Sequence, residues 1–159
     1  MLSRAVGIIE ITFHFIYLKN PVKIVMPDVE FLLDFFVLAD GGKVIFSHCS
    51  LLQCDETLIG AYFHAINSIY KICFKRDMQK VSLNEYRLHF KKIEPFFFIG
   101  ISTIHVKTKV ANENFEILSN LFYERYRNKL TKNWESDVAL FQNFNSEVDK
   151  RVKEIELSK

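Results

Sequence analysis

The chain of 159 residues is poor in the features that mark disulfide-rich, zinc-binding and nucleic-acid-binding proteins. It contains three cysteines, five glycines, three prolines and one tryptophan, and its formal net charge is only +2. Three cysteines are an odd number and lack disulfide-framework or zinc-finger spacing, so free thiols in a reducing cytoplasm are expected. A small net charge without a clustered basic face gives no electrostatic reason to expect nucleic-acid binding.

Apolar residues, in contrast, are plentiful. The chain is 49% hydrophobic and 14% aromatic, and its 16 phenylalanines predict a core rich in rings. A chain of this length is most simply one domain. The apolar stretch over residues 7–18 is too short to span a bilayer and contains Glu10 and His14. No transmembrane segment is therefore predicted.

Residues 1–30 form an N-terminal extension with two interpretations. Between residues 9 and 17, large apolar side chains alternate with polar ones, a period typical of a half-buried strand. Such a strand would pair with a sheet edge or with a partner. Alternatively, Met26, which Pro27 and Asp28 follow, is the true start and the preceding segment is non-native. The residues alone leave both interpretations open.

Residues 31–157 predict one compact domain with the element order ββαβββαα. Asp40-Gly41-Gly42 has the composition of a hairpin turn between the first two strands, and Asp55 is the expected N-cap of the first helix. The expected strands cover residues 31–39, 43–48, 80–83, 86–93 and 96–101, and the expected helices cover 55–74, 112–131 and 136–157.

Two of these strands, 31–39 and 96–101, are apolar on both faces, which is typical of strands covered on both sides. We therefore expect an α+β fold: a five-stranded antiparallel sheet with one helix on one face and two on the other. For the helix 55–74, the spacing predicts a broad buried face made of Leu58, Tyr62, Ala65, Ile66, Ile69, Ile72 and Cys73.

Four segments carry a resemblance to a known family: FFVLADGGKVIFS, DETLIGAYFHAINSIYKI, YRLHFKKIEPFFFIGIS and NFEILSNLFYERYRNKL. In this order they resemble the longin domain of the longin/roadblock superfamily. The resemblance covers about residues 31–152, and it extends to archaeal longin-like proteins and to the small subunits of adaptor and tethering complexes. The motifs are patterns of hydrophobicity and turns rather than catalytic signatures.

The resemblance implies a non-enzymatic protein-interaction module. Longin and roadblock modules are associated with small GTPases as regulators or as trafficking and tethering scaffold subunits, and they pair through a sheet edge or a helix face. The expected partners are thus a small GTPase or another longin/roadblock subunit, in a homo- or heterodimer. Two alternatives stay open: an adaptor-type structural subunit of a coat complex, and a small-molecule sensor domain.

No catalytic, cofactor or metal site is predicted. His48, Cys49, Cys54 and His64 are the best metal candidates, but their spacing fits no known zinc motif. Cys54 before a helix could act as a thiol nucleophile, yet no third group at a recognisable position would orient a base. The DGGK turn lacks the GxxxxGK[ST] pattern of a phosphate loop.

Five residues are candidates for an interface. Arg87, His89 and Lys91 alternate along one strand and form a basic strip that could meet an acidic partner or anionic lipid, so peripheral membrane association stays open. A solvated strand face is the simpler interpretation of this strip. Trp134 is either an interface anchor or a packed corner between helices, and His64 belongs to the polar face of the first helix.

Overall fold

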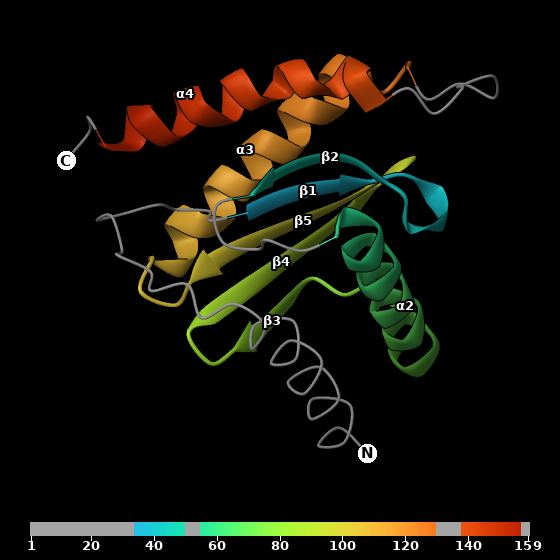
Figure 1. The fold of residues 1–159 in the computed structure, drawn as a ribbon. Helices are drawn as coiled ribbons and strands as arrows, with labels where there is room; N and C mark the ends of the chain where they lie inside the picture. The colour runs from blue at the N-terminus through green and yellow to red at the C-terminus, as the bar shows by residue number, and fades with distance from the viewer. Residues whose placement is uncertain (1–33, 50–54, 130–137, 157–159) are drawn as a thin grey trace.

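The computed structural model describes residues 34–49, 55–129 and 138–156, with side chains as far as residue 150. Five antiparallel strands form one sheet in the order β2-β1-β5-β4-β3 (Figure 1). The strands are β1 Asp34–Leu38, β2 Val44–Cys49, β3 Lys80–Leu83, β4 Tyr86–Ile93 and β5 Phe96–Thr103; the helices are η1 Asp40–Gly42, α2 Glu56–Phe74, α3 Thr108–Tyr126, η2 Val138–Phe144 and α4 Asn145–Glu156. The expected α+β element order is confirmed.

The helices are divided between the two faces of the sheet, as expected. Helix α2 lies on one face, and α3 and α4 lie on the other (Figure 1). Strands β1 and β5 pair with each other inside the sheet, from Asp34 opposite Ile101 to Leu38 opposite Phe97. Every residue of both strands is buried. The prediction that these two apolar segments are covered on both faces is confirmed.

The core between the sheet and α3, η2 and α4 is made largely of aromatic rings. Phe122 of α3 lies at its centre, with its ring centroid within 6.0 Å of six other rings: Phe46, Phe96, Phe98, Tyr126, Phe141 and Phe144. Tilted and edge-on ring pairs dominate, the arrangement that the quadrupole of an aromatic ring favours. Eight of the 16 phenylalanines belong to this core, which agrees with the ring-rich core that the sequence predicted.

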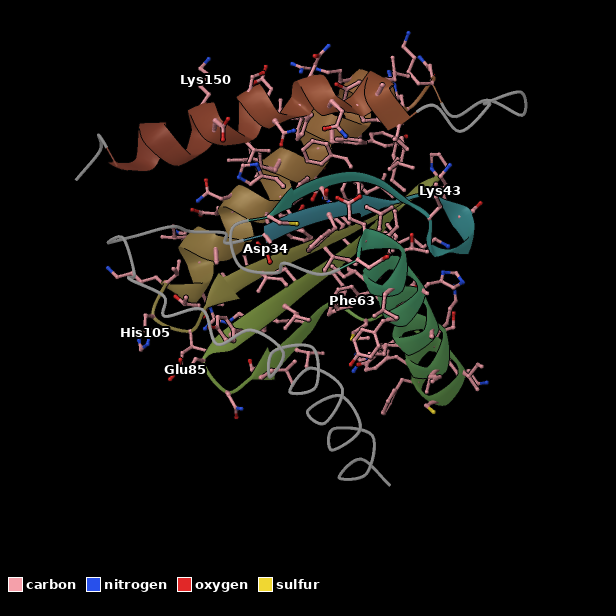
Figure 2. All side chains as sticks on the ribbon, in the orientation of Figure 1. Asp34, Lys43, Phe63, Glu85, His105 and Lys150 are labelled. Atoms are coloured by element: carbon pink, nitrogen blue, oxygen red, sulfur yellow. The ribbon has the colours of Figure 1, made fainter. Side chains whose placement is uncertain are left out.

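The core on the other face is smaller and lies under α2. Phe63 packs edge-on against Phe90 of β4, with 5.8 Å between the ring centroids, and Figure 2 places its side chain between α2 and the sheet. Ile59 of the same helix is also buried, as is Met78, which precedes β3. This second cluster holds α2 over β3 and β4.

The buried face of α2 differs from the expected one. Ile59, Gly60 and Phe63 are buried, whereas Leu58, Ile69 and Ile72 are exposed. The reason lies at Gly60, which the expected buried face did not include. A Cβ at Gly60 would stand 2.1 Å from the carbonyl oxygen of Gly42. Without one, the helix backbone can rest directly on the η1 turn, and this contact sets the rotation of the helix.

Helix α3 begins at Thr108 rather than at residue 112 and ends at Tyr126 rather than at residue 131. Its first turn therefore carries Lys109 and no acidic residue, which is an unfavourable match with the helix dipole. Ala111, fully buried against the sheet side, explains the early start, because packing outweighs the small unfavourable charge term. Phe115, Leu118, Phe122 and Tyr126 are buried along one side of the helix.

The last helix is shorter than predicted. A 3₁₀ segment, η2, precedes it over Val138–Phe144, and α4 begins at Asn145. Phe141, Phe144 and Val148 are buried. The N-terminal extension 1–30, Cys54, Trp134 and the expected start of this helix at residue 136 lie outside the described residues.

Candidate interaction surface

An apolar stripe runs along the exposed side of α2. Its members are Leu58, Ala61, Ala65, Ile69 and Ile72, and all five are exposed to solvent. Ile72 is 70% exposed, Ile69 58% and Leu58 57%. We call these five residues the α2 stripe. At ~100° per residue they fall within an arc of roughly 80°, about opposite to the buried side of the helix.

Local interactions hold this helix in place at both ends. The Asp55 carboxylate accepts hydrogen bonds from the backbone N–H groups of Thr57 and Leu58, at 2.8 and 3.2 Å, which satisfies donors that the first turn leaves free. At the other end, the backbone N–H of Lys75 donates a hydrogen bond to the carbonyl oxygen of Lys71 at 2.8 Å. Nearer the middle of the helix, the Asn67 side-chain oxygen accepts a hydrogen bond from the backbone N–H of Met78 at 3.1 Å. The stripe therefore sits on a well-anchored helix.

Strand β3 lies beside α2 and forms one edge of the described sheet. It pairs with β4 on one side, from Lys80 opposite His89 to Leu83 opposite Tyr86. Val81 and Met78 belong to the cluster under α2, so the helix and the edge strand are neighbours. A sheet edge offers backbone hydrogen-bonding groups to an added strand.

The basic strip predicted on β4 faces α3 instead of solvent. Lys91 forms an ion pair with Glu116 of α3 and donates a hydrogen bond to the side-chain oxygen of Asn120 at 2.9 Å. Arg87 donates to the backbone carbonyl of Val106 at 3.3 Å. The expectation of a solvent-exposed strand face was wrong. Residues of α3 pair with side chains of this face, and the alternation of residues within the strand does not reveal them.

His89 is the clearest correction among the interface candidates. It is only 3% exposed, its Nε2 lies 2.9 Å from the Ser102 hydroxyl, and its ring packs against Phe115. Burial, with the nearby positive charge of Arg87, lowers the pKa of His89 from 6.5 to about 4. The imidazole is thus neutral at physiological pH and does not reach a partner from this position.

His64 is exposed on α2, next to the η1 turn. A Cβ at Gly42 would stand 2.7 Å from the Cβ of His64, so the close approach of helix and turn also fixes where this imidazole lies. Its exposure agrees with the polar face to which the sequence assigned it. His64 stays a candidate contact residue, although the exposed aliphatic groups of the α2 stripe provide much more apolar area.

Groups that could do covalent or metal chemistry are scattered in the part of the chain that the structure describes. Cys49 and Cys73 are exposed thiols, and the Nδ1 of His48 lies 3.2 Å from the side-chain oxygen of Asn145. Within the described ranges, no three His, Cys, Asp or Glu side chains gather closely enough to hold a metal ion. Nor is any helix there long and apolar enough to cross a membrane.

A small hollow lies between α2 and strands β3 and β4. Only apolar side chains line it: Tyr62, Phe63, Ile66, Met78, Val81, Leu88 and Phe90. Its free space accommodates no more than about one water molecule. The sensor hypothesis called for a cavity lined by phenylalanines that holds a ligand between the layers, and this hollow is too small for such a ligand.

The sequence pattern missed the residues that matter most on this surface. Leu58, Ile69 and Ile72 were assigned to the core because their spacing places them on one broad apolar face of α2. Gly60 was the one signal that could have located the buried face, because a glycine within a helix often marks a close backbone approach. If Gly60 had been taken to mark the buried side of the helix, the residues opposite it would have been predicted to face solvent.

The layers, strand order and exposed helix define an α+β module in which a sheet carries helices on both faces.

No model of a known protein family matches the sequence, and no curated protein matches it. Among solved structures, it is similar to a Roadblock/LC7 domain from Streptomyces avermitilis, with a TM-score of 0.51, 16% identity, and coverage of 62% of this chain and 88% of that one.

MglB from Myxococcus xanthus is also similar, with a TM-score of 0.52, 13% identity, and coverage of 69% of this chain and 99% of that one. The chain therefore shares the fold of a Roadblock/LC7 domain and of MglB. The resemblance noted from the four sequence segments is confirmed at the level of fold.

Proposed function

We propose that the chain is a non-enzymatic interaction module that associates with a small GTPase, as a regulator or as a subunit of a trafficking or tethering scaffold. The α2 stripe is the observation that carries this proposal. The longin resemblance supports the type of partner, since such modules work with small GTPases and with one another. The exposed thiols of Cys49 and Cys73 suit a reducing cytoplasm, the compartment that we propose.

The stripe is notable because exposed apolar area is concentrated there. Seven large apolar side chains are exposed among the described residues, and Leu58, Ile69, Ile72 and Phe74 all lie on α2. Contiguous apolar patches on a folded surface commonly mark contact sites for proteins. The rigid helix beneath would let a partner bind with little ordering of the backbone.

Small GTPases from the same genome, each loaded with GDP or with a non-hydrolysable GTP analogue, provide the test. The full chain is immobilised, and retention of each GTPase is measured together with the binding constant in solution. We expect at least one GTPase, or one longin/roadblock subunit, to be retained in a stoichiometric complex. If none is retained in either nucleotide state, the proposal fails.

A matched pair of variants tests the surface itself. Ile72→Glu places a charge on the stripe, whereas Leu121→Glu places the same charge at an exposed leucine on α3. We expect Ile72→Glu to weaken assembly with the partner that covers the stripe by at least about tenfold, and Leu121→Glu to leave it unchanged. If the Ile72→Glu variant binds the partner as tightly as the unaltered chain, the stripe is not the contact surface.

The same stripe also supports a second candidate, an adaptor-type structural subunit of a larger coat or tether. A subunit of that kind would expose apolar area when isolated and would aggregate or associate nonspecifically. Light scattering of the purified chain over a range of concentrations distinguishes the two. A discrete, soluble species argues for the regulator, and open-ended association argues for the adaptor.

A further inference from the structure

Strand β2 forms the other edge of the described sheet, at the opposite side from β3 (Figure 1). Four of its six residues are at least partly exposed, whereas every residue of β1 and β5 is buried. None of the six residues is charged and none is proline. Proteins usually protect a sheet edge with charged side chains, with proline or with a covering segment, because a bare edge pairs with other chains. For β2 we therefore expect a covering segment.

Strand β3 is protected in the usual way. It has only four residues and begins with Lys80, and Arg76 lies shortly before it in the chain. Short length and positive charge both weaken the pairing of an edge with a further strand. The two edges of the described sheet therefore differ, and β2 is the one that needs a partner strand.

The chain contains a segment that suits this edge. Between residues 9 and 17, large apolar side chains alternate with polar ones over nine residues, which is enough to cover all six of β2. Strand β1 begins at Asp34, opposite Cys49 of β2, and an outer neighbour of β2 would lie about 10 Å from β1. The 16 residues from 18 to 33 can span about 50 Å, so the segment can reach this edge.

The two faces of the segment also match the two sides of β2. On the side of α3 and α4, Phe46 packs edge-on against Phe144, with 5.4 Å between the ring centroids. On the side of α2, Ser47 donates a hydrogen bond to the Glu56 carboxylate. The apolar face of the segment consists of Ile9, Ile11, Phe13, Phe15 and Tyr17. In an added strand this face would extend the ring core, and the polar residues between would lie beside Ser47.

We infer that residues 9–17 form a further strand that pairs with β2 of the same chain and closes this edge of the sheet. The inference does not depend on the proposed function. It leaves the β3 edge, beside the α2 stripe, open to a partner. An extended segment of another protein fits the β2 edge less well, because the tether gives the chain's own segment an effective concentration of about a millimolar or more.

Amide hydrogen exchange in the full chain tests this pairing, because alternate N–H groups of an edge strand point away from the sheet. On a bare edge these outward groups exchange rapidly, and beneath a further strand they are protected. We expect protection along the whole of β2 in the unaltered chain. Phe13→Asp places a charge on the apolar face of the segment and should speed exchange of the outward β2 groups at least about a hundredfold.

Thr12→Asp is the matched control, because it places the same charge on the polar face and should leave β2 protected. Slow exchange in β5, at the centre of the described sheet, establishes that each variant is folded. Rapid exchange of the outward β2 groups in the unaltered chain would overturn the inference, as would equal effects of the two variants. A change at β3 instead of β2 would overturn it by assigning the segment to the other edge.

Exchange measured at several protein concentrations shows which chain supplies the strand. Protection of β2 that does not depend on concentration supports pairing within one chain. Protection that appears only as the concentration rises would show that a second copy supplies the strand, and it would overturn the inference.

Discussion

The carbonyl oxygen of Gly42 rests against the backbone of Gly60, so closely that a Cβ at Gly60 would stand 2.1 Å away from it. This contact joins the η1 turn to α2 across 18 positions of the chain. It decides which side of α2 faces the sheet and, as a consequence, which residues form the α2 stripe. The candidate interaction surface thus depends on two glycines that lie outside it.

Gly60→Ala is expected to destabilise the fold strongly. The new methyl group would overlap the Gly42 carbonyl and approach Val44 to 2.9 Å, and neither backbone can move away without shifting α2. We expect a loss of roughly 3 kcal/mol in the free energy of unfolding, at the upper end of overpacking effects. Urea denaturation followed by circular dichroism measures it.

Gly41→Ala is the comparison for that experiment. Gly41 has a φ of +78°, but nothing lies within 4 Å of a Cβ there. Its substitution should cost only the left-handed backbone strain, about 1 kcal/mol. An equal loss in both variants would contradict the importance of the close contact between helix and turn.

The stability of the protein should fall between pH 6.5 and pH 4 because of His89. Its folded-state pKa of about 4 lies below the unfolded value of 6.5. Over that interval the unfolded chain binds a proton that the folded chain does not, so stabilisation present above pH 6.5 is lost as the pH falls. Linkage gives about 2 kcal/mol between pH 6.5 and pH 5.

Unfolding free energies measured at both pH values, on the unaltered chain and on His89→Gln, check this expectation. Glutamine keeps a hydrogen-bonding group near Ser102 but cannot titrate, so the variant should lose less stability on acidification. His105→Gln, at an exposed position, should behave like the unaltered chain. If His89→Gln shows the same pH dependence as His105→Gln, another group is responsible.

Phe122→Ala should cost about 3–5 kcal/mol of stability, the usual range for a buried phenylalanine. The side chain is fully buried and touches rings from β2, β5 and η2 as well as from its own helix. Its removal would leave a cavity where these elements meet. Thermal or urea unfolding measures the loss directly.

The neighbouring residue provides the control for this core substitution. Leu121→Ala removes a comparable apolar group that is 46% exposed, so the change should be within about 0.5 kcal/mol. Comparable losses at positions 121 and 122 would mean that the ring cluster does not pack as the structure describes.

Lys91 is expected to link β4 to α3 through Glu116. Because the lysine side chain is 22% exposed and the glutamate 52%, solvent screens the pair, and a coupling energy of only about 0.5–1 kcal/mol is expected. A double-mutant cycle with Lys91→Met and Glu116→Gln measures that coupling. The coupling should shrink in high salt. A coupling of zero at low salt would leave the hydrogen bond to Asn120 as the main role of Lys91.

Much of the fold could be predicted from local patterns in the sequence. The runs of apolar residues around Phe36 and Phe98 predicted central strands, since such strands face a helix on each side. Asp55 predicted a helix start because an aspartate caps free backbone N–H groups. These features depend on residues close together in the chain, so their physics is visible in the sequence.

Features that depend on distant residues could not be predicted in the same way. The alternation of Arg87, His89 and Lys91 is typical of a strand with one solvent-exposed face. Only the packing of α3 against β4 buries the imidazole of His89 and pairs Lys91 with Glu116. The start of α3 at Thr108 followed from the packing of Ala111, not from helix-end charges.

The sequence by itself determined the elements of this protein and their order, because hairpin glycines, a capping aspartate and apolar periodicity act over a few residues. Only the tertiary structure decided which side of α2 is buried. Leu58, Phe63 and Ile72 are all apolar, so local hydrophobicity cannot decide which of them is buried. The close contact between Gly60 and Gly42 decides it, because steric fit allows only one rotation of the helix on the turn. That choice leaves the α2 stripe facing outward, where a partner can reach it.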